Sequence, residues 1–97
     1  SPANKEEIKE AIQNGAYLVD VRTKGEFQHA TAKGAVHIPL MQLEANMNKF
    51  KNKKAIVLFC NTGNQSGYAQ RLLESKGIEN VYNGGSWQFV NQCLDNE

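Results

Sequence analysis

The chain has 97 residues, of which 40% are hydrophobic, and a formal net charge of +1 at pH 7. A chain of this length can form one hydrophobic core but not a second, so we expect a single domain over residues 1–97. The balanced charge gives no electrostatic footprint for nucleic acid, and no apolar stretch approaches the length of a membrane span. We therefore expect neither nucleic acid nor a membrane among its partners.

The first forty residues alternate helix and strand patterns. Asn4 and Glu7 have the spacing of a capping box, and the apolar stripe that follows ends at Gly15, which predicts a helix. Residues 17–21 and 36–38 predict two strands, the second stopped by a proline. Little periodicity is present between them, and we expect one short helical turn there.

The rest of the chain continues the alternation. Its predicted elements are, in chain order, a helix at 40–50, a strand at 55–59, a helix that ends at Gly77, a strand at 81–82, a turn at 83–85 and a last helix capped by Ser86. Four lysines between residues 49 and 54 indicate a solvated loop. Strands that alternate with helices predict a parallel sheet covered on both faces, and right-handed crossovers make it doubly wound. We expect an α/β fold with four to five strands.

Cys60 follows an apolar strand pattern directly and precedes a helical pattern. We expect its thiol at a strand-to-helix turn, at the carboxyl edge of the sheet, where ligands of open α/β folds bind. A cysteine at a helix N-terminus ionises below the ordinary pKa of about 8.5, and glycines in the loop allow main-chain N–H groups to turn toward it. The residues after Cys60 are all uncharged: Asn61, Thr62, Gly63, Asn64, Gln65 and Ser66. This pattern predicts a reactive thiolate held by dipoles, against the alternative of a buried and inert thiol.

The second cysteine and the two histidines give weaker signals. Cys93 lies on a helical pattern near the C-terminus, where a buried, idle thiol is the commoner outcome. Neither cysteine has a neighbour at zinc-ligand spacing, and His29 and His37 stand alone in the sequence. We therefore expect no metal site.

Four motifs occur in an order that resembles the rhodanese family, in particular its single-domain members. They are residues 18–22 with the Glu-Phe pair at 26–27, residues 34–39, the loop 60–67 and the segment 81–85 with its two glycines. The loop is most similar to that of a small periplasmic member of the family. The resemblance runs along most of the chain and implies a rhodanese-like α/β fold.

The resemblance also implies a sulfurtransferase of the thiosulfate type. Cys60 would be the nucleophile: it takes a sulfane sulfur from a donor such as thiosulfate, becomes a persulfide, and passes the outer sulfur to cyanide or a thiol. The main-chain amides of residues 61–65 would bind the outer sulfur and the anionic donor, and no metal or organic cofactor is required. The supporting residues would be Asp20, Arg22 and Ser66.

Asp20 lies in the first strand pattern and Arg22 follows it directly, and this strand should end beside the loop. They could line the cleft, but we favour a structural role for both. In that role, Arg22 pairs with Glu26 or with the loop backbone.

Two departures from the family pattern bear on the donor. Gln65 stands where many rhodanese loops have arginine, so a dianionic donor should bind more weakly. Ala-Thr-Ala at residues 30–32 replaces the usual Gly-His-Ile. The alternative function is therefore a persulfide carrier or rhodanese-like binding module that serves a protein partner, such as a protein persulfide donor, and has little thiosulfate activity.

Cysteine phosphatases and arsenate reductases share the strand–loop–helix arrangement. They require an arginine six residues after the cysteine, to bind a tetrahedral anion through two hydrogen bonds. Ser66 has that position here, and the loop contains no cation, which disfavours this class.

The start of the sequence and the resemblance both bear on the compartment. The chain begins with serine and not with methionine, so we expect a trimmed N-terminus, produced either by removal of a targeting peptide or by the boundary chosen for expression. The resemblance to a small periplasmic protein favours the periplasm, reached by way of a removed signal peptide, with the cytoplasm as the alternative.

Overall fold

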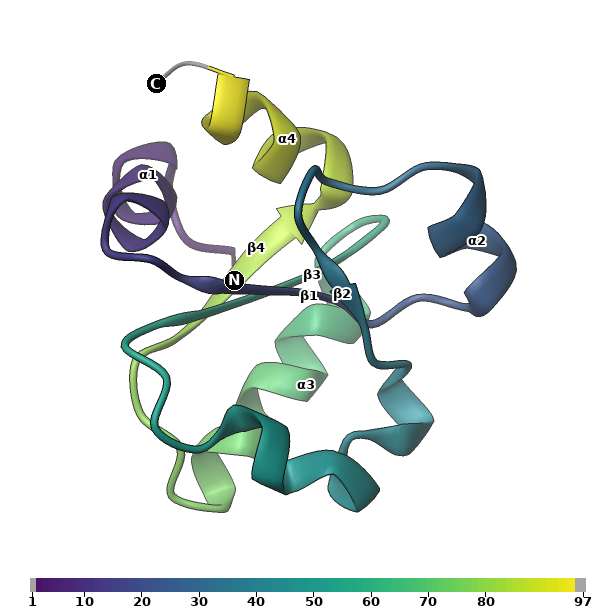
Figure 1. Ribbon diagram of the computed structural model, residues 1–97, viewed down its shortest axis with the longest axis vertical. Helices are drawn as coiled ribbons and strands as arrows, with labels where there is room; N and C mark the ends of the chain where they lie inside the picture. Colours follow the sequence, from purple (N-terminus) through teal and green to yellow (C-terminus); the bar gives the residue numbers. More distant parts are fainter. Residues whose placement is uncertain (1, 96–97) are drawn as a thin grey trace.

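The computed structural model describes residues 2–95. Across those residues the chain forms one four-stranded parallel sheet in the order β2-β1-β3-β4 (Figure 1). Its strands are β1 (Tyr17–Asp20), β2 (Val36–His37), β3 (Ile56–Cys60) and β4 (Val81–Ser86). The helices are α1 (Lys5–Gln13), α2 (Lys24–His29), α3 (Asn64–Ser75) and α4 (Trp87–Asp95), with two 3-10 segments, η1 (Leu40–Gln42) and η2 (Glu44–Phe50). The predicted doubly wound α/β fold is confirmed, and its sheet has four strands.

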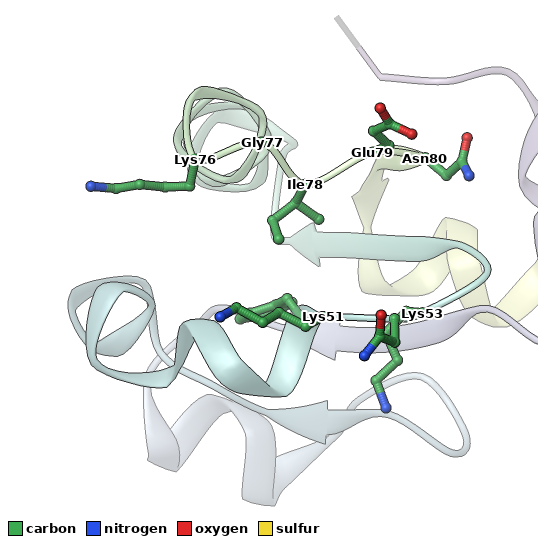
Figure 2. Close-up of a pocket in the computed structure, with 9 residues that line it drawn as sticks. Lys51, Lys53, Lys76, Gly77, Ile78, Glu79 and Asn80 are labelled. Carbon is green, nitrogen blue, oxygen red and sulfur yellow. The ribbon is translucent and has the colours of Figure 1, made fainter.

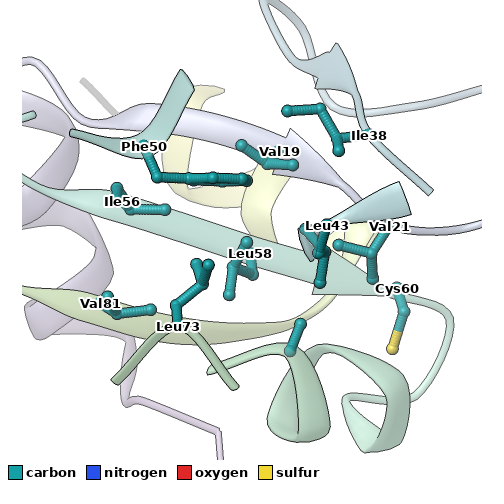
Figure 3. Close-up of a cluster of buried hydrophobic side chains, with 11 residues drawn as sticks. Val19, Val21, Ile38, Leu43, Phe50, Ile56, Leu58, Cys60, Leu73 and Val81 are labelled. Atoms are coloured by element: carbon teal, nitrogen blue, oxygen red, sulfur yellow. The ribbon is translucent and has the colours of Figure 1, made fainter. Parts of the chain in front are cut away.

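Helices cover both faces of the sheet. α1 and α4 lie on one face, and α3 lies on the other together with η1 and η2 (Figure 1). Every residue of β3, one of the two inner strands, is buried, as its uninterrupted apolar run predicts. Successive side chains of a strand point to opposite faces, so Ile56, Leu58 and Cys60 share the core cluster on the α3 side (Figure 3). Val57 and Phe59 pack in the cluster on the opposite side.

Local signals set several helix ends where the sequence predicts them. The side chain of Asn4 accepts a hydrogen bond from the Glu7 N–H at 2.9 Å, and the Glu7 carboxylate accepts one from the Asn4 N–H at 3.0 Å. Gly77 follows α3 in the left-handed conformation, with φ +86°. The Ser86 hydroxyl accepts a hydrogen bond from the Phe89 N–H at 3.1 Å, at the start of α4.

The predicted helix at 40–50 is wrong in its type, because this stretch forms η1 and η2. Asn46 has non-helical dihedral angles, φ −119° and ψ 25°. Its side-chain amide donates to the carbonyl of Gln42 at 2.8 Å, and its main-chain N–H donates to the carbonyl of Leu43 at 3.0 Å. The side chain therefore occupies the carbonyl that an α-helical N–H would use, and the backbone forms the tighter 3-10 bond instead.

The predicted turn at 83–85 is also wrong, because these residues lie inside β4. The strand shifts its register against the end of β3, and Gly85 has φ +79° there. Gly84 lies under α4: a Cβ atom at this position would be 2.7 Å from Cγ2 of Val90. Gly85 therefore permits the irregularity in the strand, and Gly84 permits the close approach between β4 and α4.

The carboxyl ends of the parallel strands share one edge of the sheet. Asp20 ends β1, Cys60 ends β3 and Ser86 ends β4 at this edge. At the opposite edge, the loops before β3 and β4 line a hollow of about 420 Å³ that includes the exposed Lys51 and Lys53 (Figure 2). The solvated loop is confirmed for Lys51, Lys53 and Lys54, whereas Lys49 lies in the last turn of η2. The loop lies at the other end of the strands from Cys60.

Candidate active site

Cys60 lies at the turn between β3 and α3, with 1% of its surface exposed. Its sulfur accepts hydrogen bonds from the main-chain N–H groups of Gly63, at 3.0 Å, and Ser66, at 3.4 Å. Gly63 is left-handed, with φ +95°, and α3 begins at the next residue, so Ser66 offers one of the unpaired N–H groups of the first helical turn. Figure 3 shows the sulfur at the end of the apolar cluster, beside the start of α3.

Two opposing effects act on the pKa of Cys60. Burial raises this pKa, because the charged sulfur loses its hydration. Hydrogen bonds from the Ser66 hydroxyl and from the main-chain N–H groups of Ser66, Thr62 and Gly63 lower it, and they prevail, so the pKa lies below its ordinary value. Since the thiolate is the nucleophilic form of cysteine, the surroundings favour the reactive state.

Asn83 is a buried polar residue of this site that the sequence analysis does not identify. It lies in β4 and is 2% exposed. Its side-chain oxygen accepts hydrogen bonds from the Ser66 hydroxyl at 2.6 Å and from the Gly85 N–H at 3.0 Å, and its side-chain nitrogen donates to the Gly63 carbonyl at 2.9 Å. Asn83 therefore connects β4 to two of the residues that surround the Cys60 sulfur. The only sequence signal was a polar residue after a strand pattern, and Asn-Gly-Gly is also typical of a turn.

Two side chains hold Asn61, the first residue of the loop. Glu26 accepts a hydrogen bond from its amide nitrogen at 2.7 Å, and Arg22 donates one to its amide oxygen at 3.1 Å. Glu26 is placed for this contact by a capping box with Thr23 at the start of α2. Hydrogen bonds from Asn61 and Thr23 lower the pKa of the Glu26 carboxyl. The first turn of α2 thus orients the beginning of the loop.

Four of the five predicted loop residues are exposed, and only Gly63 is buried: the exposed ones are Asn61, Thr62, Asn64 and Gln65. The Thr62 hydroxyl accepts a hydrogen bond from the Asn64 N–H at 3.4 Å. Gln65 lines a mainly apolar hollow of about 210 Å³ together with Met41, which is 92% exposed. The side chains of these residues lie at the surface and not around the sulfur.

Asp20 and Arg22 form a buried ion pair, with 2.8 Å between Oδ2 and Nη2. The Thr31 hydroxyl donates a further hydrogen bond to Oδ2 at 2.8 Å. The predicted partner of Arg22 is Glu26 or the loop backbone, but its charged partner is Asp20 instead. It contacts Glu26 only at the main-chain carbonyl, at 3.5 Å, and the loop through the side chain of Asn61, at 3.1 Å. A carboxylate that is fully buried needs a counter-charge, and the guanidinium two residues along the chain supplies it. The Trp87 ring lies against this pair, with its centre 5.6 Å from the guanidinium carbon.

Cys93 packs in the core cluster between the sheet and α4, on the opposite face from Cys60. Burial raises its pKa, which is the reverse of the net effect on Cys60. Within the part of the chain that the structure describes, His, Cys, Asp and Glu side chains form no group of three or more that could hold a metal ion. No helix between residues 2 and 95 has both the length and the apolar character needed to cross a bilayer.

Comparison with known proteins places this arrangement in a family. Residues 4–91 match the rhodanese-like domain. The thiosulfate sulfurtransferase PspE of Escherichia coli is 32% identical over 76 residues, which cover 76% of this chain and 73% of PspE. Among solved structures, the human single-domain sulfurtransferase TSTD1 is 26% identical with a TM-score of 0.70, and the match covers 99% of this chain and 96% of that one.

Two relatives from Bacillus subtilis are longer than this chain. YqhL is 37% identical over 68 residues, which cover 70% of this chain and 54% of YqhL. YrkF, whose name describes it as a candidate sulfur carrier protein, is 33% identical over 66 residues, which cover 68% of this chain and 36% of YrkF. The matched region thus spans about half of the first protein and about a third of the second.

Together, the parallel α/β fold and the cysteine at a strand-to-helix turn define the class of the protein. The chain belongs to the rhodanese-like domain family, as the match over nearly its whole length shows. The resemblance predicted from the sequence motifs is therefore confirmed, and relatives in the family are named as thiosulfate sulfurtransferases and, in one case, as a candidate sulfur carrier.

Proposed function

We propose that the protein transfers a sulfane sulfur from a donor such as thiosulfate to cyanide or a thiol, through a persulfide on Cys60. The observation that carries this proposal is the sulfur of Cys60 itself, which accepts N–H hydrogen bonds from Gly63 and Ser66 at the start of α3. A buried sulfur with such donors is a nucleophile with a stabilised negative charge, and covalent catalysis needs a group of this kind.

The reaction divides into two displacements at sulfur. The Cys60 thiolate attacks the outer sulfur of thiosulfate, the S–S bond of the donor breaks, and sulfite leaves with the electron pair. The product is a persulfide anion, whose outer sulfur lies one bond beyond the present sulfur position. Cyanide or a thiolate then attacks that outer sulfur, and Cys60 leaves as the thiolate that began the cycle.

The loop amides serve both displacements in this proposal. Gly63 and Ser66 stabilise the charge on the inner sulfur, and the remaining N–H groups of residues 61–65 bind the outer sulfur and the donor anion. The loop side chains carry no charge, so the stabilisation comes from fixed dipoles. Asn61, held between Glu26 and Arg22, keeps the first part of the loop in place.

The test is thiocyanate formation from thiosulfate and cyanide. We expect activity in the wild-type protein and none in Cys60→Ser, whose hydroxyl is a far weaker nucleophile. Cys93→Ser is the matched control, because it changes the other thiol, on the opposite face of the sheet, and it should keep the wild-type rate. Sulfur transfer by Cys60→Ser at the wild-type rate would refute the proposal.

A second candidate is a persulfide carrier that a protein donor loads. The exposed, uncharged Gln65 favours it, because a loop without a cation binds the thiosulfate dianion weakly. The relative YrkF, named as a candidate sulfur carrier, adds to this reading. The two candidates differ in donor preference: a carrier has a very high KM for thiosulfate and is loaded quickly by a cysteine desulfurase.

A further inference from the structure

The orientation of the Asn83 side-chain amide is fixed by the main chain on both sides. Its nitrogen faces the Gly63 carbonyl at 2.9 Å, which can only accept a hydrogen bond, and its oxygen faces the Gly85 N–H at 3.0 Å, which can only donate one. The oxygen therefore also faces the Ser66 hydroxyl at 2.6 Å. Because a serine hydroxyl has a single proton, that proton is donated to Asn83.

This arrangement determines what Ser66 presents to the sulfur. Its hydroxyl oxygen lies 3.3 Å from the Cys60 sulfur, and with its proton directed at Asn83 it presents lone pairs there. A protonated thiol can donate its own proton to this oxygen. A thiolate cannot, and it gains from Ser66 only if the hydroxyl proton rotates away from Asn83. The Asn83 oxygen then still accepts the hydrogen bond from the Gly85 N–H, so the rotation leaves no buried group unpaired.

We propose that Asn83 is a positioning residue that acts through Ser66: it holds the Ser66 hydroxyl proton while Cys60 is protonated, and yields that proton to the sulfur when Cys60 ionises. Asn83 thus competes with the sulfur for one proton and sets how readily the nucleophile of the proposed sulfur transfer forms. The benefit to sulfur transfer rests on the proposed function, but the competition for the Ser66 proton occurs without a sulfur donor.

Asn83→Ala and Asn83→Leu remove the competing oxygen. The Ser66 hydroxyl then donates to the thiolate without giving up another partner, so the pH midpoint of Cys60 alkylation by iodoacetamide falls, by about half to one pH unit for one hydrogen bond. A purely structural role predicts the opposite sign, since a loosened loop loses its N–H donors and the midpoint rises. Peptide mass spectrometry separates Cys60 from Cys93 in this assay.

Ser66→Ala tests whether Asn83 acts on Cys60 through the Ser66 hydroxyl. Alone it should raise the midpoint, because the thiolate loses a donor. In this background, Asn83→Ala should shift the midpoint by less than a third of its effect in the wild-type protein. An equal shift in both backgrounds, or a rise in Asn83→Ala and Asn83→Leu, overturns the proposal.

The wild-type protein provides a readout that does not depend on the folding of any Asn83 variant. At a pH where Cys60 is protonated, its S–H infrared band, assigned by its loss in Cys60→Ser, should lie below the frequency of a thiol that donates no hydrogen bond. A band at the unbonded frequency would contradict the assigned direction of the Ser66 proton. Persulfide formation from thiosulfate, measured on the same samples, separates failure of this inference from failure of the proposed function.

Discussion

Replacing Asp20 by asparagine tests whether the ion pair at the end of β1 is structural. The carboxylate is fully buried and accepts hydrogen bonds from the Arg22 N–H at 2.9 Å, from its side-chain Nε and Nη2, and from the Thr31 hydroxyl. Asparagine has one acceptor oxygen, and its NH2 group would face these donors. Breaking a buried ion pair by changing one partner costs about 3–5 kcal/mol, out of about 5–15 kcal/mol for a typical domain.

Urea unfolding followed by Trp87 fluorescence measures this cost. Trp87 is the only tryptophan of the chain, and its ring lies against the Arg22 guanidinium. We expect Asp20→Asn to lower the unfolding midpoint with an unchanged m value. The double variant Asp20→Leu with Arg22→Met should lose less stability than the sum of its single changes, because no buried charge is left unpaired.

Two results would refute this reasoning. One is a loss of less than about 1 kcal/mol in Asp20→Asn, since that is below the range for a broken buried pair. The other is an Asp20→Asn protein that keeps wild-type stability and yet transfers no sulfur, which would place the carboxylate in the chemistry itself.

Three further predictions concern the loop, the core and the thiols. Gln65→Arg adds a cation beside the loop, so the KM for thiosulfate should fall roughly three- to tenfold with little change in kcat, and Gln65→Met should leave it unchanged. Gly84→Ala brings a Cβ atom within 2.7 Å of Val90, so the free energy of unfolding measured with urea should fall by about 1–3 kcal/mol. Because the pKa of Cys60 is lowered and that of Cys93 is raised, iodoacetamide should modify Cys60 at a lower pH. Equal modification of both thiols at neutral pH would contradict those opposite shifts.

The position of Cys60 could be predicted from the pattern around it together with the alternation of strands and helices along the chain. The apolar run of β3 stops at this residue and a helical pattern follows, so a parallel sheet places the thiol at the carboxyl edge. The alternation of side chains along β3 then directs it toward α3.

The role of Asn83, the residue of β4 that binds Ser66 beside Cys60, could not be predicted in this way. Asn83 reaches Ser66 because β4 pairs in parallel with β3, which places Asn83 opposite Leu58, a residue whose side chain lies on the α3 face. Local patterns contain no information on that pairing, and Asn-Gly-Gly suggested a turn. Likewise, the spacing of apolar residues after β2 predicted an α-helix. That prediction fails because the Asn46 side chain donates to the Gln42 carbonyl, and apolar spacing contains no information on this bond.

The most direct test is the mass of the intact protein after mixing with thiosulfate, before and after cyanide is added. The account predicts a gain of one sulfur atom, located on the Cys60 peptide, and a return to the starting mass with cyanide. Cys93→Ser should behave in the same way, and Cys60→Ser should stay unchanged. A sulfur found on Cys93, or a sulfur gain that persists in Cys60→Ser, would contradict the claim that the thiol held by Gly63 and Ser66 carries the transferred atom.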